Sequence, residues 1–199
     1  METLLSICLG IGLSAACGFR IFVPLLIMSI GSLSGHLTLA QGFDWIGTYP
    51  ALITFAVATC LEITGYYVPW VDNLLDTAAT PAAVIAGTVI TAALVTDLSP
   101  MMKWTLAIIA GGGAAGMVQG ATVLARGASS VTTAGLGNPL LATIELGGSV
   151  ITSIVAVIAP ILLVVVLVLC GIVFGKKLLR KVSPTQQTAQ QPLSAGGQI

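Results

Sequence analysis

Residues 62–81 read Glu-Ile-Thr-Gly-Tyr-Tyr-Val-Pro-Trp-Val-Asp-Asn-Leu-Leu-Asp-Thr-Ala-Ala-Thr-Pro and lie between two long apolar runs. The stretch contains Glu62, Asp72 and Asp76, which are three of the seven acidic residues of the chain. A carboxylate at or near hydrocarbon is costly, so one that is retained usually has a partner, a cavity or a function. The stretch therefore marks a boundary between membrane spans and a candidate functional region.

The composition around this stretch is that of an integral membrane protein. Hydrophobic residues make up 56 % of the chain and charged residues 7 %, too few to cover a water-soluble surface. Apolar runs able to cross about 30 Å of hydrocarbon recur, which predicts an all-α polytopic transmembrane bundle in one domain, residues 1–182. Residues 183–199 are polar and are expected to form a disordered tail. The zero net charge gives no support to a nucleic-acid partner.

The apolar runs predict about five spans, with kinked or broken helices. They cover residues 3–32, 50–67, 81–95, 104–125 and 139–175. The first run is interrupted by Gly18, Arg20 and Pro24, so the alternative to a single first span is a re-entrant pair of half-helices. The fifth run is longer than one span requires, so it is expected to tilt, bend or emerge from the membrane as a helix.

Prolines divide the acidic connector. Pro69 suits the first position of a short helix, and Asp72 would then lie in the first turn, where negative charge is favoured. Asp72 and Asp76 are four residues apart and share one helix face. Thr80–Pro81 resembles an N-cap followed by the first residue of the next span, and Asn138–Pro139 repeats this pattern.

The distribution of basic residues predicts the orientation. Four of the seven follow the last apolar run directly: Lys176, Lys177, Arg180 and Lys181. This cluster predicts a multi-pass protein of the cell membrane with a cytoplasmic C-terminus, and a contact with anionic lipid. Counting back through five spans places the acidic connector and the polar connector 127–138 on the outer face.

Arg20 is the most unusual cation of the chain because it lies too far inside the first apolar run to reach water easily. Pro24 removes the helical hydrogen bond to the carbonyl of residue 20, so a cation and a freed carbonyl coincide. A buried guanidinium needs a carboxylate, and Glu62 and Glu145 are the candidates. The arrangement is either an anion site or gating ion pair, or a structural pair that locks the bundle.

The other charged residues allow several interpretations. Asp72 and Asp76 could attract a cation at an outer vestibule, lie on a solvated interfacial helix, or pair with Arg126. The connector 127–138 is either a re-entrant loop or an ordinary outer loop. The spacing matches no metal motif, and no cofactor is expected.

Small residues on the fourth run indicate close helix packing. Gly112, Gly116 and Gly120 form a doubled GxxxG pattern that suits packing within the chain or in a homo-oligomer. Catalysis has little support, because His36 is the only histidine and no hydrolase or metalloprotease motif is present. We therefore expect a protein that is not an enzyme.

Three pieces of the chain resemble the DUF4126 family, a group of small bacterial and plastid membrane proteins of unknown function. They are Ala-Cys-Gly-Phe-Arg-Ile-Phe-Val-Pro-Leu at 16–25, Glu62 with Val-Pro-Trp-Val-Asp-Asn-Leu-Leu-Asp at 68–76, and the block 126–145 with Thr-Thr-Ala-Gly-Leu-Gly-Asn-Pro. The resemblance extends over about residues 10–160. It implies no established activity.

Together these residues predict a polar pocket that opens to the outer face. Its lining or bracing residues would be Arg20, Glu62, Asp72, Asp76, Arg126, Asn138 and Glu145. The leading hypothesis is a small channel or transporter for an ion or small polar solute, acting alone or as a homo-oligomer. The alternative is a non-transporting scaffold or assembly factor in which the charges are structural ion pairs. A membrane-embedded enzyme is the third hypothesis.

Overall fold

The computed structural model describes residues 1–68 and 71–182, and every regular element in these ranges is helical. The all-α prediction is thereby confirmed. The chain divides into two compact parts, Met1–Leu163 and Val164–Ile199. Helix α8 (Pro160–Val182) begins in the first part and makes up the described residues of the second. The predicted tail 183–199 lies outside the described residues.

The first part contains seven α-helical segments before α8. They are α1 (Glu2–Cys17), α2 (Phe22–Leu33), α3 (Tyr49–Gly65), α4 (Val71–Leu94), α5 (Pro100–Leu106), α6 (Gly113–Thr133) and α7 (Asn138–Ile158). A 3₁₀ turn, η1 (Asp44–Gly47), precedes α3, and a π-helical turn, η2 (Ala107–Gly112), joins α5 and α6 into one continuous helix.

The length and composition of the helices are those of a membrane protein. Within the described part of the chain, three helices are long and apolar enough to cross a membrane: Leu74–Leu94, Pro100–Thr133 and Asn138–Ile158. The other apolar helices, α1, α2, α3 and residues 160–173 of α8, are shorter, at 10–17 residues. About five apolar runs in the sequence therefore correspond to three helices of spanning length and several shorter ones.

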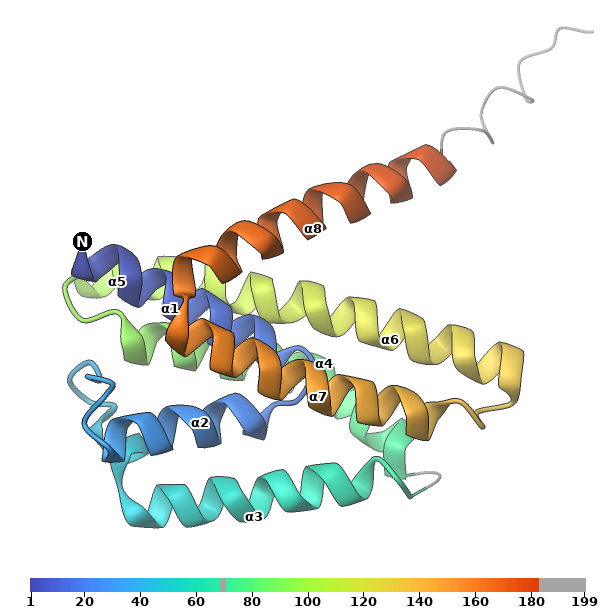
Figure 1. Cartoon of the computed structure of the whole chain (residues 1–199), viewed down its shortest axis with the longest axis horizontal. Helices are drawn as coiled ribbons and strands as arrows, with labels where there is room; N and C mark the ends of the chain where they lie inside the picture. Colours follow the sequence, from blue (N-terminus) through green and yellow to red (C-terminus); the bar gives the residue numbers. More distant parts are fainter. Residues whose placement is uncertain (69–70, 183–199) are drawn as a thin grey trace, which may run out of the picture. The chain divides into compact units, whose positions relative to one another are not determined.

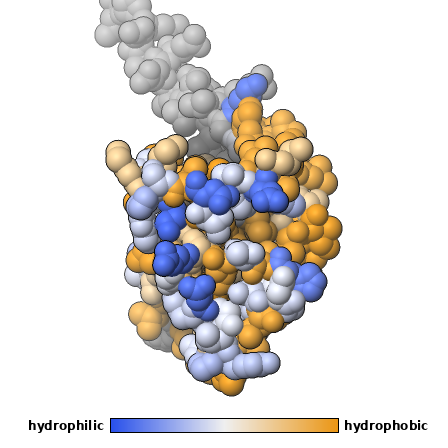
Figure 2. Space-filling model, turned by 90° about the vertical axis from the view of Figure 1, so that its left-hand side faces the viewer, coloured by the Kyte–Doolittle hydropathy of each residue, from blue (hydrophilic) through white to orange (hydrophobic). Residues whose placement is uncertain are grey.

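Helices α3, α4, α5–α6 and α7 run back and forth between two ends of the first part (Figure 1). We call these the loop end, which carries residues 34–48 and 95–99, and the connector end, which carries residues 66–68 and 134–137. At the loop end the Ala40 N–H donates to the Ala93 carbonyl at 2.7 Å. Figure 2 looks onto the loop end, where hydrophilic residues gather between apolar flanks.

Helices α1 and α2 form a hairpin that starts and finishes at the loop end (Figure 1). Thr3 Oγ1 donates to Asp97 Oδ2 at the loop end, at 3.4 Å. In contrast, Gly18 at the break lies against Ala115 and Gln119, near the middle of the 34-residue helix Pro100–Thr133. Residues 3–32 are therefore not one continuous helix but two short ones, as the re-entrant alternative requires. The reason is that side chains of other helices satisfy the broken backbone, as described below.

Pro81 differs from the sequence expectation, whereas Pro160 produces the bend that was one of the outcomes expected for the fifth run. Pro81 lies inside α4, so the acidic stretch and the following span form one helix instead of two. Pro160 separates α7 from α8, because the residue before a proline is driven out of the helical region, and Ala159 has φ −140° and ψ 64°. Residues 139–175 therefore belong to two helices, and counting back from the basic cluster no longer determines which connectors face outward.

The connector after Arg126 is shorter than predicted. Helix α6 continues through Thr133, so neither a re-entrant loop nor a long outer loop occupies residues 127–138. Ala134 and Gly135, with φ of 52° and 85°, reverse the chain in the left-handed region. The turn is held by the Gly137 N–H, which donates to Thr133 Oγ1 at 3.0 Å.

The glycines of the GxxxG pattern have unequal surroundings. A Cβ at Gly112 would lie 2.6 Å from Thr88 Oγ1, and one at Gly116 would lie 3.2 Å from a methyl of Val84. Both glycines thus face α4. A Cβ at Gly120 would meet nothing within 4 Å.

Candidate functional site

Four of the charged residues identified in the sequence meet in one group, which we call the charge cluster: Arg20, Asp76, Arg126 and Glu145. Arg126 of α6 and Glu145 of α7 form a two-point ion pair, with Nε to Oε1 at 2.9 Å and Nη2 to Oε2 as the second contact. Arg20 Nη2 lies 3.6 Å from the same Oε2 atom. Arg126 Nη1 also lies 3.7 Å from Asp76 Oδ1 of α4. Glu145 therefore joins two guanidinium groups.

The two guanidinium groups of the charge cluster are buried and covered by an aromatic ring, whereas the Asp76 side chain is 21 % exposed. Arg20 is 1 % exposed and Arg126 is 3 % exposed. The guanidinium carbons of Arg20 and Arg126 lie 3.8 and 4.3 Å from the centroid of Tyr66, within the range of favourable cation–π contacts.

The break between α1 and α2 lies directly beside the charge cluster. Arg20 follows the C-terminus of α1, where a positive charge is favoured, and its Nη2 also donates to the Ala142 carbonyl at 2.9 Å. Ser149 Oγ donates to the Ala16 carbonyl at 3.1 Å. The Ser149 hydroxyl of α7 thus donates to a carbonyl at the C-terminal end of α1, and the Ala142 carbonyl of α7 accepts from Arg20, so α7 supplies partners to polar groups at the buried break.

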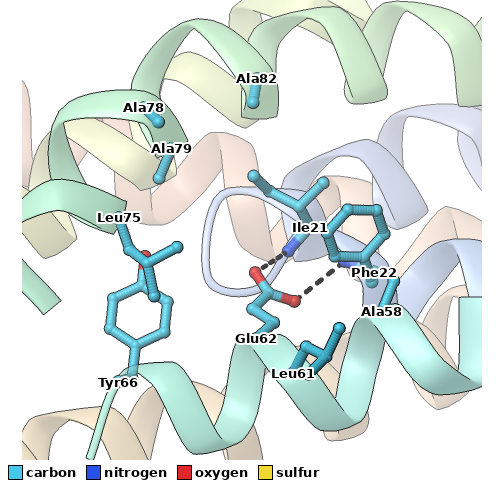
Figure 3. Close-up of a pocket in the computed structure, with 10 residues that line it drawn as sticks. All are labelled: Ile21, Phe22, Ala58, Leu61, Glu62, Tyr66, Leu75, Ala78, Ala79 and Ala82. Atoms are coloured by element: carbon cyan, nitrogen blue, oxygen red, sulfur yellow. Dashed lines mark hydrogen bonds between the residues drawn. The ribbon is translucent and has the colours of Figure 1, made fainter. Parts of the chain in front are cut away.

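Glu62 of α3 completes the other side of the break. Its Oε1 accepts the Ile21 N–H at 2.8 Å and its Oε2 accepts the Phe22 N–H at 3.1 Å (Figure 3). A negative charge is favoured at the N-terminus of α2, where N–H groups lack helical partners. Of the two carboxylates proposed for Arg20, Glu145 is the one in ion-pair range, whereas Glu62 caps α2.

Asp72 and Asn138 form a second polar contact between the start of α4 and the start of α7. Asn138 Nδ2 donates to Asp72 Oδ2 at 3.4 Å and to Ser130 Oγ at 3.3 Å. Asp72 is 8 % exposed, so its carboxylate is buried instead of solvated. This contact ties the connector end together.

A pocket of about 390 Å³ opens beside Glu62. Ten residues from α3, α4 and the start of α2 line it (Figure 3). Glu62 and Tyr66 are the polar ones among them, and the other eight are Ile21, Phe22, Ala58, Leu61, Leu75, Ala78, Ala79 and Ala82. Arg20 and Arg126 do not line the pocket; the ring of Tyr66 contacts both guanidinium groups and also borders the pocket.

The donor and acceptor inventory of this region limits what it can bind. In the described part of the chain, no three His, Cys, Asp or Glu side chains come together in a way that could hold a metal ion. Arg20 Nε and Nη1 and Arg126 Nη1 are buried without a hydrogen-bond partner among the described residues. A small polar molecule could meet these donors inside the cluster, but the accessible space lies at Glu62.

Sequence analysis missed two contributors, Tyr66 and Ser149. Tyr66 follows Glu62 by four residues and so shares its helix face. Ser149 lies on a buried stripe of α7 that also contains Glu145 and Ser153. In both cases, the sequence signal that could have identified these residues is a polar residue four positions from a carboxylate in an apolar helix.

Comparison with known proteins gives a family match without an activity. A family model described as "Domain of unknown function (DUF4126)" matches residues 7–180. No curated protein and no solved structure matches the chain. The matched range contains the whole charge cluster and every residue of the pocket.

Proposed function

We propose that this chain, which belongs to the DUF4126 family, is a transporter whose solute site is the pocket at Glu62. The observation that supports the proposal is a helix break inside the first part, capped by a carboxylate that also lines a pocket. Many secondary transporters bind their solutes at such discontinuous helices, where helix ends supply fixed partial charges.

Glu62 gives a physical link between solute binding and movement. Its carboxylate makes charge-assisted hydrogen bonds to the first N–H groups of α2. A proton or cation that takes up part of this negative charge weakens those bonds. Because α2 packs mainly against α3, which carries Glu62, this change favours a shift of the hairpin relative to α3. Binding and hairpin position are thereby coupled.

The paired state of the charge cluster supports a carrier over a channel. Its guanidinium groups are almost fully buried and do not line the accessible pocket, and the ring of Tyr66 lies against both of them and borders the pocket. A continuous polar pore would need these groups to face water. The cluster acts in this proposal as a rigid support for the break, while Glu62 interacts with the solute.

A non-transporting scaffold is the second candidate function, and one observation favours it. Arg126, Glu145 and Arg20 form a closed network that joins α6, α7 and the α1–α2 break. Such a network can serve only to fix the arrangement of the helices. In that case lipid chains would fill the pocket at Glu62.

Reaction of a pocket cysteine with a water-soluble reagent separates the two candidates without knowledge of the solute. Native Cys8, Cys17, Cys60 and Cys170 would be replaced by alanine, and Ala58→Cys would be introduced on the pocket wall. Sealed vesicles would be treated with a membrane-impermeant maleimide, added outside or trapped inside. We expect Ala58→Cys to react, because a solute pocket must open to water.

Three further single-cysteine variants calibrate this experiment. His36→Cys at the loop end and Leu136→Cys at the connector end are exposed and identify the two sides of the membrane. Ala121→Cys is exposed on α6 and does not line the pocket. If Ala58→Cys reacts no faster than Ala121→Cys from either side, the pocket is a lipid-filled groove and the transport proposal is wrong.

A further inference from the structure

We infer that the pocket at Glu62 binds an amphiphilic organic cation, with an amine on the carboxylate and a hydrocarbon body against the alanine wall. The inference rests on the proposed transport site and adds the chemical class of its solute. It follows from the polar inventory of the pocket, from its wall and from the charge balance around it.

The polar inventory favours a ligand that donates hydrogen bonds. A carboxylate has about four lone-pair positions, and Glu62 uses two of them to accept the Ile21 and Phe22 N–H groups. Capacity to accept therefore remains. Tyr66, the other polar residue of the pocket, is hydrogen-bonded to Asp76. The pocket thus offers acceptors and negative charge, and the donors nearest to Glu62 are already used.

The wall favours a ligand that is otherwise apolar. Ala78, Ala79 and Ala82 of α4 face Ala58 of α3 across the pocket, and their small side chains leave the space open (Figure 3). A volume of about 390 Å³ falls in the range of small-molecule sites. A sugar or another solute with many hydroxyl groups would lose its hydrogen bonds with water against this wall and gain few in return.

The charge balance favours a cation over an anion. The region contains two guanidinium groups, those of Arg20 and Arg126, and three carboxylates, those of Glu62, Asp76 and Glu145. The positive charge is held mainly by Glu145, which contacts both guanidinium groups. Glu62 is the carboxylate that borders the accessible space, so a monovalent cation bound there balances the group.

Direct binding of three probes of matched size tests the inference. They are 2-phenylethylamine, 2-phenylethanol and 3-phenylpropionate, measured by equilibrium dialysis with the purified full chain in detergent. The amine is expected to bind at least about ten-fold more tightly than the alcohol, because a hydrogen bond to a charged group contributes about 1.5–3 kcal/mol. The carboxylate probe is expected to bind more weakly than both.

Four variants assign the binding to the pocket. Glu62→Gln should lower amine affinity about ten-fold or more, whereas Glu2→Gln, at an exposed carboxylate of α1, should leave it unchanged. Ala82→Leu fills the pocket without touching the hydrogen bonds of Glu62 and should also weaken binding. Ala121→Leu is its control on an exposed face of α6. Ala82→Leu keeps the test decisive if Glu62→Gln does not fold.

Each contrary outcome has one meaning. Equal binding of amine and alcohol, or undiminished binding by both Glu62→Gln and Ala82→Leu, overturns the cation site. A reactive Ala58→Cys together with absent amine binding retains the transport site and rejects the solute class. If the amine binds but Ala58→Cys does not react with the maleimide, the cation site is retained and the transport proposal is wrong.

Discussion

Glu145 and Glu62 are equally buried, at 6 % and 7 % exposure, but lie in two regions with opposite surroundings. Glu145, in the charge cluster, contacts the guanidinium groups of Arg20 and Arg126. Glu62, at the pocket, accepts two backbone N–H groups and borders open space. The charge of Glu145 is compensated by two guanidinium groups in ion-pair range, whereas that of Glu62 is compensated mainly by two N–H groups at a helix start, with a weaker contribution from Arg20.

This difference separates a bracing charge from an exchangeable one. Removing one member of a buried ion pair leaves an uncompensated charge in a low-dielectric interior, which is strongly destabilising. Neutralising Glu62 leaves two N–H groups at a helix start, which is a smaller loss because N-cap contributions are about 1 kcal/mol. A group whose charge can be neutralised at small cost is suited to bind and release a cation.

The largest expected effect is that of Glu145→Ala. It leaves the buried Arg20 without its ion-pair partner and Arg126 with only the longer contact to Asp76, so we expect the free energy of unfolding to fall by about 3–5 kcal/mol. Denaturant unfolding in detergent, followed by circular dichroism, measures it. The matched control Arg126→Met/Glu145→Met removes the two-point pair as a unit and should recover part of the loss. If Glu145→Ala lowers the free energy of unfolding by no more than Glu62→Gln does, the two carboxylates do not differ in the way proposed.

The second largest effect is expected for Gly18→Ala. Gly18 allows the α1–α2 break, which lies between the charge cluster and the pocket, to approach α6 closely. A Cβ there would lie 2.5 Å from Val118 Cβ and 2.6 Å from the Ala115 carbonyl oxygen. Backbone atoms cannot move aside easily, so Gly18→Ala should lower the unfolding free energy by about 1–3 kcal/mol. Gly120→Ala is the matched control, because it meets nothing within 4 Å and should be neutral or stabilising by up to about 1 kcal/mol.

The sequence was sufficient to identify the charged residues of both regions but not their partners. Arg20, Glu62 and Glu145 stand out because charges are rare in apolar runs. The pairing of Arg20 with Glu145, and the capping of α2 by Glu62, depend on where the chain turns back. The hydrogen-bond partners of that turn lie on α3 and α7, far away in sequence. The periodicity of apolar residues carries no information about such distant contacts.

The prolines show the same limit at the level of the fold. Pro81 and Pro160 both lie in apolar surroundings, yet α4 continues through the first and α7 ends before the second. A proline lowers the stability of any helix that contains it, but packing of the flanking turns decides whether the helix breaks. The helical class could thus be predicted from composition, whereas the number and direction of spans could not.

Glu62→Gln should have a moderate effect on stability, smaller than that of Gly18→Ala or close to it. The amide oxygen can accept one of the two N–H groups, but the amide nitrogen then faces the other, so we expect a loss of about 1–2 kcal/mol. Hydrogen exchange should accelerate at the Ile21 and Phe22 amides, with little change at amides around Glu145. Unchanged exchange at these two amides would show that Glu62 does not cap α2.

The smallest expected effect is that of Tyr66→Phe, at the residue that belongs to both regions. Its ring stacks with Arg20 and Arg126, while its hydroxyl interacts with Asp76. Phenylalanine keeps the aromatic face and loses one hydrogen bond, so the unfolding free energy should fall by about 0.5–1.5 kcal/mol. Tyr66→Leu loses the aromatic face as well and should cost about 1–2 kcal/mol more, because desolvated cation–π contacts contribute that amount. If the Phe and Leu variants unfold at the same denaturant concentration, the hydroxyl and not the ring connects the pocket to the charge cluster.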